Sequence, residues 1–356
     1  MCNQAENAEF TLLKAECANT AFYDLPRPPF LIYGLLGDQD YLRMPEKAAR
    51  QVSDSVMSLN TNTAGGRIRF QTDSQRITLL CRYPWIGRYV NFCRIGESCF
   101  DLYADGQYVG AFLPEQGNMP ETPEPVTYRM TITLPDRKMR DMVIHFPSYN
   151  AVSRVSVGLD SDAVLLPGKE YRPIHPIVYY GSSITQGGCA SHAGNSYQNI
   201  IARELNVDYR NLGFSGSCKA EPRMADYLAG LTMSVFVYDY DHNAPDAAYL
   251  EVTHEPLFRK IREKQPELPV IFISASDNSF GSSVQARRAV ILRTYENALA
   301  RGDRNVYFID GRQMYRRVGL ELCTVDTCHP NDLGFWCMAN TIGSMLKQIL
   351  LPCGSD

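Results

Sequence analysis

The sequence has no long apolar run and no excess of charge of one sign. None of its apolar runs approaches the roughly 18 residues of a membrane-spanning helix, so no membrane partner is expected. Thirty-five Lys and Arg residues against 39 Asp and Glu residues give a net charge of −4, which provides no general attraction to nucleic acid. The first ten residues also lack a basic start followed by an apolar stretch, the pattern of a signal peptide.

Several motifs that identify other classes of protein are absent. The sequence contains no Gly-x-x-x-x-Gly-Lys phosphate loop and no His-Glu-x-x-His zinc motif. Cys323 and Cys328 have no second cysteine pair that would complete a zinc site. The Gly-x-Ser-x-Gly elbow of α/β-hydrolases is not formed, because Thr185 occupies its last position. We therefore expect no metal ion and no cofactor.

Length and composition favour a globular protein of about two domains. The chain has 356 residues, of which 45% are hydrophobic and 21% are charged. Its 11 cysteines are an odd number and are scattered, mostly inside apolar runs, which fits reduced thiols better than a disulfide framework. We therefore expect a cytoplasmic location, with a secreted or periplasmic one as the alternative if processing precedes residue 1.

The first half of the chain shows the period of two that is typical of half-buried β-strands. Apolar and polar side chains alternate through residues 127–134. Similar short runs, separated by turn formers, lie at residues 67–71, 77–82, 100–103, 108–112 and 155–159. We expect an antiparallel β-sandwich domain over residues 1–168. Its first 60 residues are less periodic and are interpreted as an arm or as lead-in strands.

The pattern changes after a linker-like stretch, PGKEYRP, at residues 167–173. Beyond it, apolar runs alternate with helical or turn segments, at residues 177–180, 207–212, 233–238, 270–274 and 306–309. Alternating strands and helices predict an α/β domain with a parallel sheet covered on both faces, over residues 169–356.

Four segments carry groups suited to chemistry at the carboxyl edge of such a sheet, where active sites gather. YYGSSITQGG at residues 179–188 presents Ser183, and NLGFSGS at residues 211–217 contains Gly216. DYDHNAP at residues 239–245 contains Asn243. In DTCHPNDLGF, at residues 326–335, the candidates are Asp326 and His329, with Pro330 placed to open the final helix.

Together these segments resemble the SGNH hydrolase family, the GDSL-like serine esterases, at four blocks in the family's order. The resemblance implies that Ser183 is the nucleophile, that Gly216 and Asn243 donate hydrogen bonds to the oxyanion, and that Asp326 and His329 are the orienting acid and the general base. It also implies a flavodoxin-like three-layer catalytic domain.

The sequence departs from the family pattern at two of these blocks. Ser182 stands where the first block usually has Asp, and residues 241–244 read Asp-His-Asn-Ala instead of Gly-x-Asn-Asp. Neither change removes a proposed catalytic group. The N-terminal half resembles the β-sandwich that precedes the catalytic domain in the GxDLY-type subset, through FDLYADGQYVGAF at residues 100–112 and SVGLD at residues 156–160.

The chemistry explains why an esterase needs these residue types. A serine hydroxyl is a poor nucleophile at neutral pH, so His329 must take its proton, while Asp326 holds the imidazole in the required tautomer. Backbone N–H groups and an amide would stabilise the oxyanion. Taken singly, Ser183 also fits an N-cap, Gly216 a turn and Asn243 an Asx-turn, but the combination favours catalysis.

The sequence therefore predicts a serine esterase that hydrolyses O-acyl esters, acetyl esters first, on a small molecule or a glycan. The alternatives are a lipase or thioesterase that acts on longer chains, and a catalytically silent carbohydrate-binding protein. His192 and His242 flank the site loops and are candidates to line the pocket.

Overall fold

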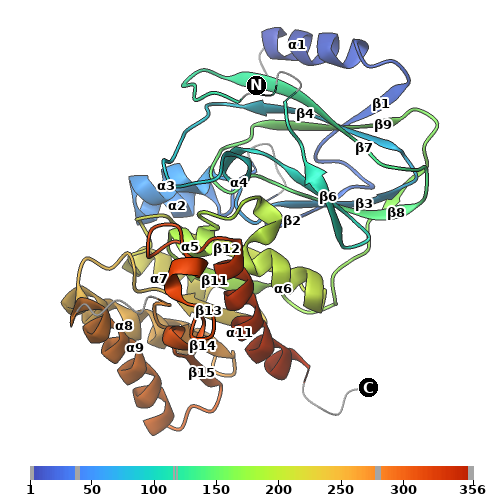
Figure 1. The fold of residues 1–356 in the computed structure, drawn as a ribbon. Helices are drawn as coiled ribbons and strands as arrows, with labels where there is room; N and C mark the ends of the chain where they lie inside the picture. The colour runs from blue at the N-terminus through green and yellow to red at the C-terminus, as the bar shows by residue number, and fades with distance from the viewer. Residues whose placement is uncertain (1–3, 37–40, 115–116, 118, 277–281, 352–356) are drawn as a thin grey trace.

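The computed structural model describes residues 4–36, 41–114, 117, 119–276 and 282–351, and its first half contains two antiparallel sheets (Figure 1). The first sheet has the order β1-β9-β4-β7 and consists of Thr20–Asp24, Arg154–Asp160, Arg76–Tyr83 and Val126–Thr133. The second has the order β10-β3-β8-β5-β6 and consists of Leu165–Pro167, Arg67–Thr72, Arg140–His145, Asp101–Ala104 and Gln107–Ala111. Strand β2 (Leu31–Tyr33) pairs with β3 beside β10.

The two sheets pack face to face and enclose one apolar core, as the alternating pattern predicts. The core takes side chains from both sheets, among them Leu79 and Val157 of the first and Phe70 and Ile144 of the second. All four are buried completely. The predicted antiparallel β-sandwich is therefore confirmed.

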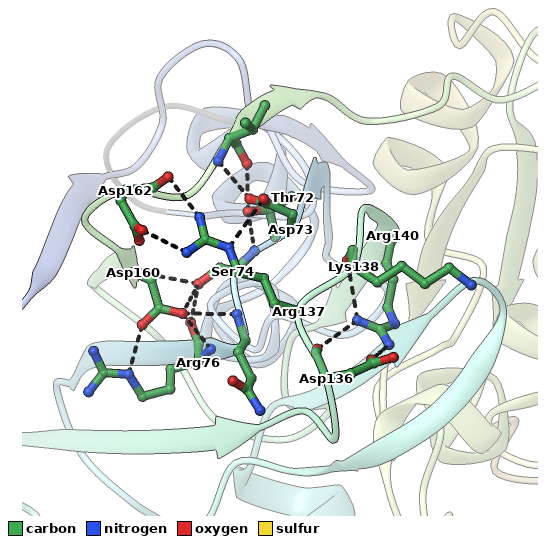
Figure 2. A network of polar contacts seen from close by, with 12 residues as sticks. Thr72, Asp73, Ser74, Arg76, Asp136, Arg137, Lys138, Arg140, Asp160 and Asp162 are labelled. Atoms are coloured by element: carbon green, nitrogen blue, oxygen red, sulfur yellow. Dashed lines mark hydrogen bonds and ion pairs between the residues drawn. The ribbon is translucent and has the colours of Figure 1, made fainter.

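A network of carboxylates and arginines holds one end of the sandwich together (Figure 2). Asp160, which ends the SVGLD segment, accepts hydrogen bonds from the backbone N–H of Arg76 at 3.1 Å and from its Nε at 2.8 Å. Burial would raise the pKa of Asp160, but these bonds lower it. Arg137 binds Asp73 and Asp162 on the neighbouring turns. The network thereby pins the β3–β4 turn to the end of β9.

The second half is a parallel five-stranded sheet with helices on both faces. Its order is β12-β11-β13-β14-β15, formed by Tyr209–Gly213, Ile177–Gly181, Val235–Asp239, Val270–Ile273 and Val306–Ile309. This order, with the first strand second in the sheet, is that of flavodoxin-like folds. The predicted α/β fold class is therefore confirmed.

Helices cover both faces of the sheet (Figure 1), and alternate side chains of the strands pack against opposite layers of helices. Tyr179 and Val237 pack with α6 (Tyr197–Leu205) and α11 (Asp332–Leu350). Val178 and Phe236 pack with α7 (Pro222–Ala229), α8 (Ala247–Lys264) and α9 (Ser282–Ala300). Because both faces are buried, the strands read as continuous apolar runs. None of the helices in the described part of the chain combines the length and apolar character needed to cross a bilayer.

In the described part of the first 60 residues, β1 and β2 are lead-in strands as expected, since they pair with β9 and β3, but the sequence did not predict the three helices that accompany them. Helix α1 (Gln4–Ala15) lies over the first sheet, where its Glu9 binds Arg82 at 2.7 Å. Helix α2 (Glu46–Val52) packs with α3 (Asp54–Asn60) and with α7, and Ala49 and Val56 enter the core of the parallel sheet. The division into residues 1–168 and 169–356 therefore stays a proposal, with α2 and α3 completing the second core.

Two buried arginines join the halves. Arg67 on β3 donates to Asp208 at 2.5 Å and to the Tyr209 carbonyl at 3.1 Å, and its guanidinium lies 3.9 Å from the Tyr209 ring centroid. Arg43 donates to the carbonyls of Gly213 and Leu59, both at 2.5 Å. Burial lowers the pKa of Arg43 to about 9. Both arginines thus fix β12 against segments from the first half.

A buried carboxylate provides a third junction. Asp101, from the FDLYADG segment, accepts from Nδ1 of His145 at 2.5 Å, from Nδ1 of His192 at 2.8 Å and from the backbone N–H of Gly194 at 2.6 Å. Burial would raise the pKa of Asp101, but the two imidazoles hold it well below its usual range. His192 therefore binds at this junction, where its ring stacks on Tyr108.

We expect Asp101→Asn to lower the free energy of unfolding by about 1–3 kcal/mol, because the amide loses the charge that three buried donors share. Urea unfolding at pH 7 measures this. Asp105→Asn is the matched control: Asp105 lies on an exposed turn with a φ of 49°, which Asn tolerates. Equal unfolding midpoints for Asp101→Asn and the wild type would contradict the junction's contribution.

His254 is a titratable group inside the core of the second half. Its ring stacks on Tyr238 at 4.3 Å between centroids, and its Nδ1 lies 2.9 Å from Oγ1 of Thr294. Its Nε2 has no hydrogen-bond partner among the described residues. Burial lowers the pKa of His254 to about 3. The folded protein therefore holds this imidazole neutral.

This burial predicts a loss of stability in acid. An unfolded imidazole takes up a proton below its ordinary pKa of about 6.5, whereas the folded one does not, so stability falls as the pH drops from about 6.5 towards 3. Between pH 7 and pH 5 the His254 contribution should fall by about 2 kcal/mol. Urea unfolding at both pH values should show a smaller loss for His254→Phe, which keeps the stacked ring. An identical loss in both proteins would contradict the assignment.

Candidate active site

The carboxyl ends of three parallel strands lie level and form the floor of the site. Gly181 at the end of β11 is in register with Gly213 of β12 on one side and with Asp239 of β13 on the other. The loops that carry the candidate groups follow these three positions. The strand register therefore brings Ser183, Gly216 and Asn243 to one edge, as expected for this class of sheet.

The candidate nucleophile begins a short helix, α5 (Ser183–Gln186), packed tightly on the strand ends. Ser182 caps this helix, and its Oγ accepts from the N–H of Ile184 at 3.2 Å. A Cβ on Gly181 would lie 2.1 Å from Oγ1 of Thr185, and one on Gly213 would lie 2.2 Å from the backbone nitrogen of Gln186. Only glycine at both strand ends allows this close approach.

Ser183, His329 and Asp326 form a continuous chain of hydrogen bonds. Ser183 Oγ lies 2.8 Å from His329 Nε2, and His329 Nδ1 lies 2.7 Å from Asp326 Oδ2. With Asp326 ionised, Nδ1 carries the proton that it donates to the carboxylate, and Nε2 accepts from the serine hydroxyl. Ser183 exposes 8% of its surface. The geometry is that of a nucleophile, a base and an orienting acid.

The loop that carries His329 is a tight turn fixed at both ends. Thr324 and Pro330 form an isolated antiparallel bridge, and the N–H of Val325 donates to the His329 carbonyl at 3.0 Å. Helix α11 begins at Asp332 with Asn331 as its N-cap, so Pro330 does not open the helix as expected but precedes the cap. The side chain of Asn331 caps the helix more effectively because it accepts from the N–H of Gly334.

Asp326 is held ionised by its surroundings. Its Oδ1 accepts from the backbone N–H groups of His329 at 2.7 Å and of Cys328 at 3.1 Å. Partial burial would raise the pKa of Asp326, but the bonds from the backbone and side chain of His329 and from Asn91 lower it to about 2. The carboxylate thus keeps its charge throughout the neutral range.

Two backbone N–H groups in the loops at this edge of the sheet are free to bind an anion. In the described structure, no hydrogen bond is made by the N–H of Ser183 or by that of Gly216. Gly216 has a φ of 68°, and a Cβ there would meet nothing within 4 Å, so it borders open space. This combination of unused donors and open space suits an oxyanion.

Asn243 lies in the next loop with its amide oriented. Its Oδ1 accepts from the N–H of Cys218 at 3.3 Å, which leaves the Nδ2 group as a donor. Arg287 on α9 holds this loop, because its Nη1 donates to the carbonyls of Asp241 at 2.6 Å and of Ala244 at 2.7 Å. The loop that carries Asn243 is therefore held in place by a guanidinium from a helix that is distant in the sequence.

Two acids lie beneath the loops. Burial and the neighbouring Asp241 raise the pKa of Asp239 to about 6, against the hydrogen bond that Thr185 donates at 3.0 Å. His242 lies 3.7 Å from Asp241 and 3.8 Å from the Cys328 sulfur. Burial lowers the pKa of His242, but Asp241, Cys328 and Asp239 together outweigh burial and raise the pKa to about 10. Among the described residues, no three His, Cys, Asp or Glu side chains are grouped to hold a metal ion.

The sandwich supplies residues that the motifs do not predict. Tyr149 donates to the carbonyl of Ser183 at 3.0 Å, and Asn91 donates to Asp326 Oδ2 at 2.8 Å. The Phe92 ring lies 5.9 Å from the His329 ring. Asn91 is separated from Asp326 by 235 positions, and it lies in no repeating pattern. Only the three-dimensional contact identifies it.

Comparison with known families covers most of the chain. Residues 174–347 match the model of the GDSL-like lipase/acylhydrolase family, and residues 23–165 match a model described as the N-terminus of SGNH hydro-type esterases. No match was found among curated proteins.

Solved structures share the whole architecture. A protein from Bacteroides ovatus described as a GDSL-like lipase has a TM-score of 0.81 and 27% identity, over 93% of this chain and 98% of its own. The salicylyl-acyltransferase SsfX3 from a tetracycline biosynthetic pathway has a TM-score of 0.75 and 18% identity, over 94% and 99%. An acetyl xylan esterase, Est2A, from the rumen bacterium Butyrivibrio proteoclasticus has a TM-score of 0.58 and 13% identity, over 93% and 99%.

The last two structures show a common fold, while the family models and the first structure agree on the family. The resemblance seen in the four motif blocks and in the FDLYADG segment is thereby confirmed. Residues 174–347 therefore form a GDSL-like lipase/acylhydrolase domain of the SGNH hydrolase type, residues 23–165 form the N-terminal β-sandwich of the GxDLY type, and the protein is a carboxylic ester hydrolase.

Proposed function

We propose that this protein is a serine esterase that removes short acyl groups, acetate first, from a carbohydrate through an acyl-enzyme on Ser183. The observation that carries the proposal is the unbroken chain from Ser183 Oγ through His329 to Asp326, with contacts of 2.8 and 2.7 Å. A serine bonded to a base that is itself oriented by an acid is the arrangement that nucleophilic acyl transfer requires.

In the first half of the reaction, Ser183 Oγ attacks the ester carbonyl carbon while His329 Nε2 takes the hydroxyl proton. The imidazolium that results is stabilised by the ionised carboxylate of Asp326. When the tetrahedral intermediate collapses, the bond to the alcohol oxygen breaks, and His329 returns the proton to that oxygen. The alcohol leaves, and the acyl group remains on Ser183.

The negative charge on the carbonyl oxygen is the second requirement. We assign its stabilisation to the N–H groups of Ser183 and Gly216 and to the Nδ2 group of Asn243. Each of these groups is held in place before substrate binds, which avoids reorganisation during the reaction. Their support comes from the α5 cap, from the positive φ of Gly216 and from the bond between Asn243 Oδ1 and Cys218.

In the second half, water attacks the acyl-enzyme, and the same groups act in reverse. His329 takes a proton from the water and gives it to Ser183 Oγ as the carboxylic acid is released. Water is the only further reactant, so the proposed reaction needs no cofactor.

The small exposure of Ser183 supports a short acyl group, since only 8% of this residue is open to solvent. The fold shared with an acetyl xylan esterase supports a glycan as the alcohol part. We also propose a cytoplasmic location, which the nine free thiols among the described cysteines support.

The assignment of the nucleophile predicts the result of active-site labelling. A fluorophosphonate should add once to the wild type, as an Oγ–P bond forms and fluoride leaves, and should not add to Ser183→Ala. Hydrolysis of p-nitrophenyl acetate by that variant should fall by roughly 10⁶-fold. Intact mass and a chromogenic assay measure the two results.

Ser217→Ala, in the neighbouring Gly216 loop, is the control and should be labelled like the wild type. Labelling of Ser183→Ala would show that another residue is the nucleophile. No labelling of any of the three proteins would favour the silent carbohydrate-binding protein instead.

The acyl-length assignment predicts a falling series. We expect kcat/KM to fall by about 10- to 100-fold from p-nitrophenyl acetate to octanoate, because extra methylenes in a confined site cost about 1–3 kcal/mol. Acetate release from acetylated xylo-oligosaccharides tests the glycan part. A series that rises towards octanoate would instead indicate a lipase or thioesterase.

A further inference from the structure

A loop of the sandwich reaches the proposed catalytic acid. It comprises residues 84–93, between β4 and α4 (Arg94–Ser98). Asn91 Nδ2 donates to Asp326 Oδ2 at 2.8 Å, and this is the oxygen that also accepts from His329 Nδ1 at 2.7 Å. Asn91 is half-buried, whereas its neighbour Val90 is fully exposed. The amide therefore contacts the same carboxylate oxygen as the imidazole.

The loop is built to hold this amide in one place. The N–H of Tyr89 donates to Oε1 of Glu97 at 2.8 Å, and the N–H of Gly87 donates to Oδ1 of Asn150 at 3.0 Å. The Phe92 ring packs edge-on against Tyr149 at 4.4 Å between centroids. The loop is thus anchored to the body of the sandwich on both sides of Asn91.

On the other side, the thiol of Cys189 contacts the Asn91 carbonyl oxygen at 3.3 Å. Cys189 follows α5, the helix that begins with Ser183. The backbone of Asn91 and its side chain therefore contact two separate loops of the proposed catalytic site. These contacts fix the position of the amide relative to both the serine and the acid.

The bonds to Asp326 divide between its two oxygens. Oδ1 accepts only from backbone N–H groups of its own turn, those of Cys328 and His329. Oδ2 accepts from His329 Nδ1 and from Asn91. Asn91 is thus the contact from outside the turn that sets the plane of the carboxylate, and with it the direction in which the imidazole points.

We infer that Asn91 is a positioning residue for the esterase reaction, and that the sandwich is in this sense part of the active site. The inference rests on the proposed function, because it assigns Asn91 a role through Asp326 and His329. Asn91 Nδ2 and His329 Nδ1 lie 3.5 Å apart, and both are donors when Asp326 is ionised. Two donors facing one oxygen keep both the amide and the Nδ1 proton directed at the carboxylate.

The test compares Asn91→Asp, Asn91→Ala and the control Val90→Ala in hydrolysis of p-nitrophenyl acetate. Asn91→Asp keeps the size of the side chain, removes the donor and adds a charge beside Asp326. We expect kcat to fall by about 10- to 100-fold in both Asn91 variants, and further in Asn91→Asp, with KM within about twofold. Val90→Ala should match the wild type.

The outcomes separate positioning from packing. A loss of kcat in Asn91→Ala with wild-type kcat in Asn91→Asp would show that Asn91 only fills space, and the inference would be wrong. Urea unfolding of each variant shows whether a loss of kcat reflects unfolded protein; an unfolding midpoint that falls with kcat in both variants would also overturn it.

Fluorophosphonate labelling separates this inference from the proposed function. If the wild type is labelled on Ser183, labelling of Asn91→Asp should be slower by the same factor as kcat, because labelling also depends on His329 as the base. An equal labelling rate in both proteins would overturn the role of Asn91 while leaving the proposed function intact. A wild type that is not labelled would overturn the proposed function first.

Discussion

The close approach of helix α5 to the ends of β11 and β12 is the constraint on which the site depends. It exists because Gly181 and Gly213 carry no side chain, and a single carbon on either would lie about 2 Å from α5 atoms. With the helix pressed onto the strand ends, the hydroxyl of Ser183 lies level with the loops that follow β12 and β13. The tight turn before α11 then brings His329 to the same level.

The two halves meet through buried charges. Arg43, Arg67 and Asp101 are each almost fully buried, and each bonds to groups from both halves or from segments packed on them. A buried ion gains little net stability over an apolar pair, but an ion that loses its partner is costly. Such contacts therefore favour one relative arrangement of the two halves. In that arrangement Asn91 and Tyr149 of the first half contact the candidate site.

Much of the fold could be predicted because periodicity reports burial directly. The alternation through residues 127–134 predicts a strand with one buried face, and β7 forms there; the apolar run at residues 306–309 predicts a strand buried on both faces, and β15 forms there. Residues 46–60 gave no such signal, because α2 and α3 are only about two turns long and bury few side chains each. Helix α7, against which α2 packs, lies more than 160 positions further along the chain.

The candidate site likewise contains some residues that local sequence predicts and others that only the tertiary structure reveals. Ser183, Gly216, Asn243, Asp326 and His329 stand at strand ends or before the last helix, where local sequence predicts loops, and the structure brings them to one edge; their roles stay a proposal. Asn91 holds that edge from a loop of the sandwich, and Arg287 holds it from a distant helix. The sequence around Asn91 and Arg287 does not identify them as site residues, because they support the site through contacts with residues that are distant in the sequence.

The path of the chain through α2 and α3 has a consequence for how this protein can change over evolution. The chain leaves the sandwich, contributes Ala49 and Val56 to the core of the parallel sheet, and returns to complete the sandwich before the second half begins. Neither half is therefore one uninterrupted stretch of gene. Recombination at the linker would separate the parallel sheet from part of its own core, so natural exchange should favour inheritance of the two halves as one unit.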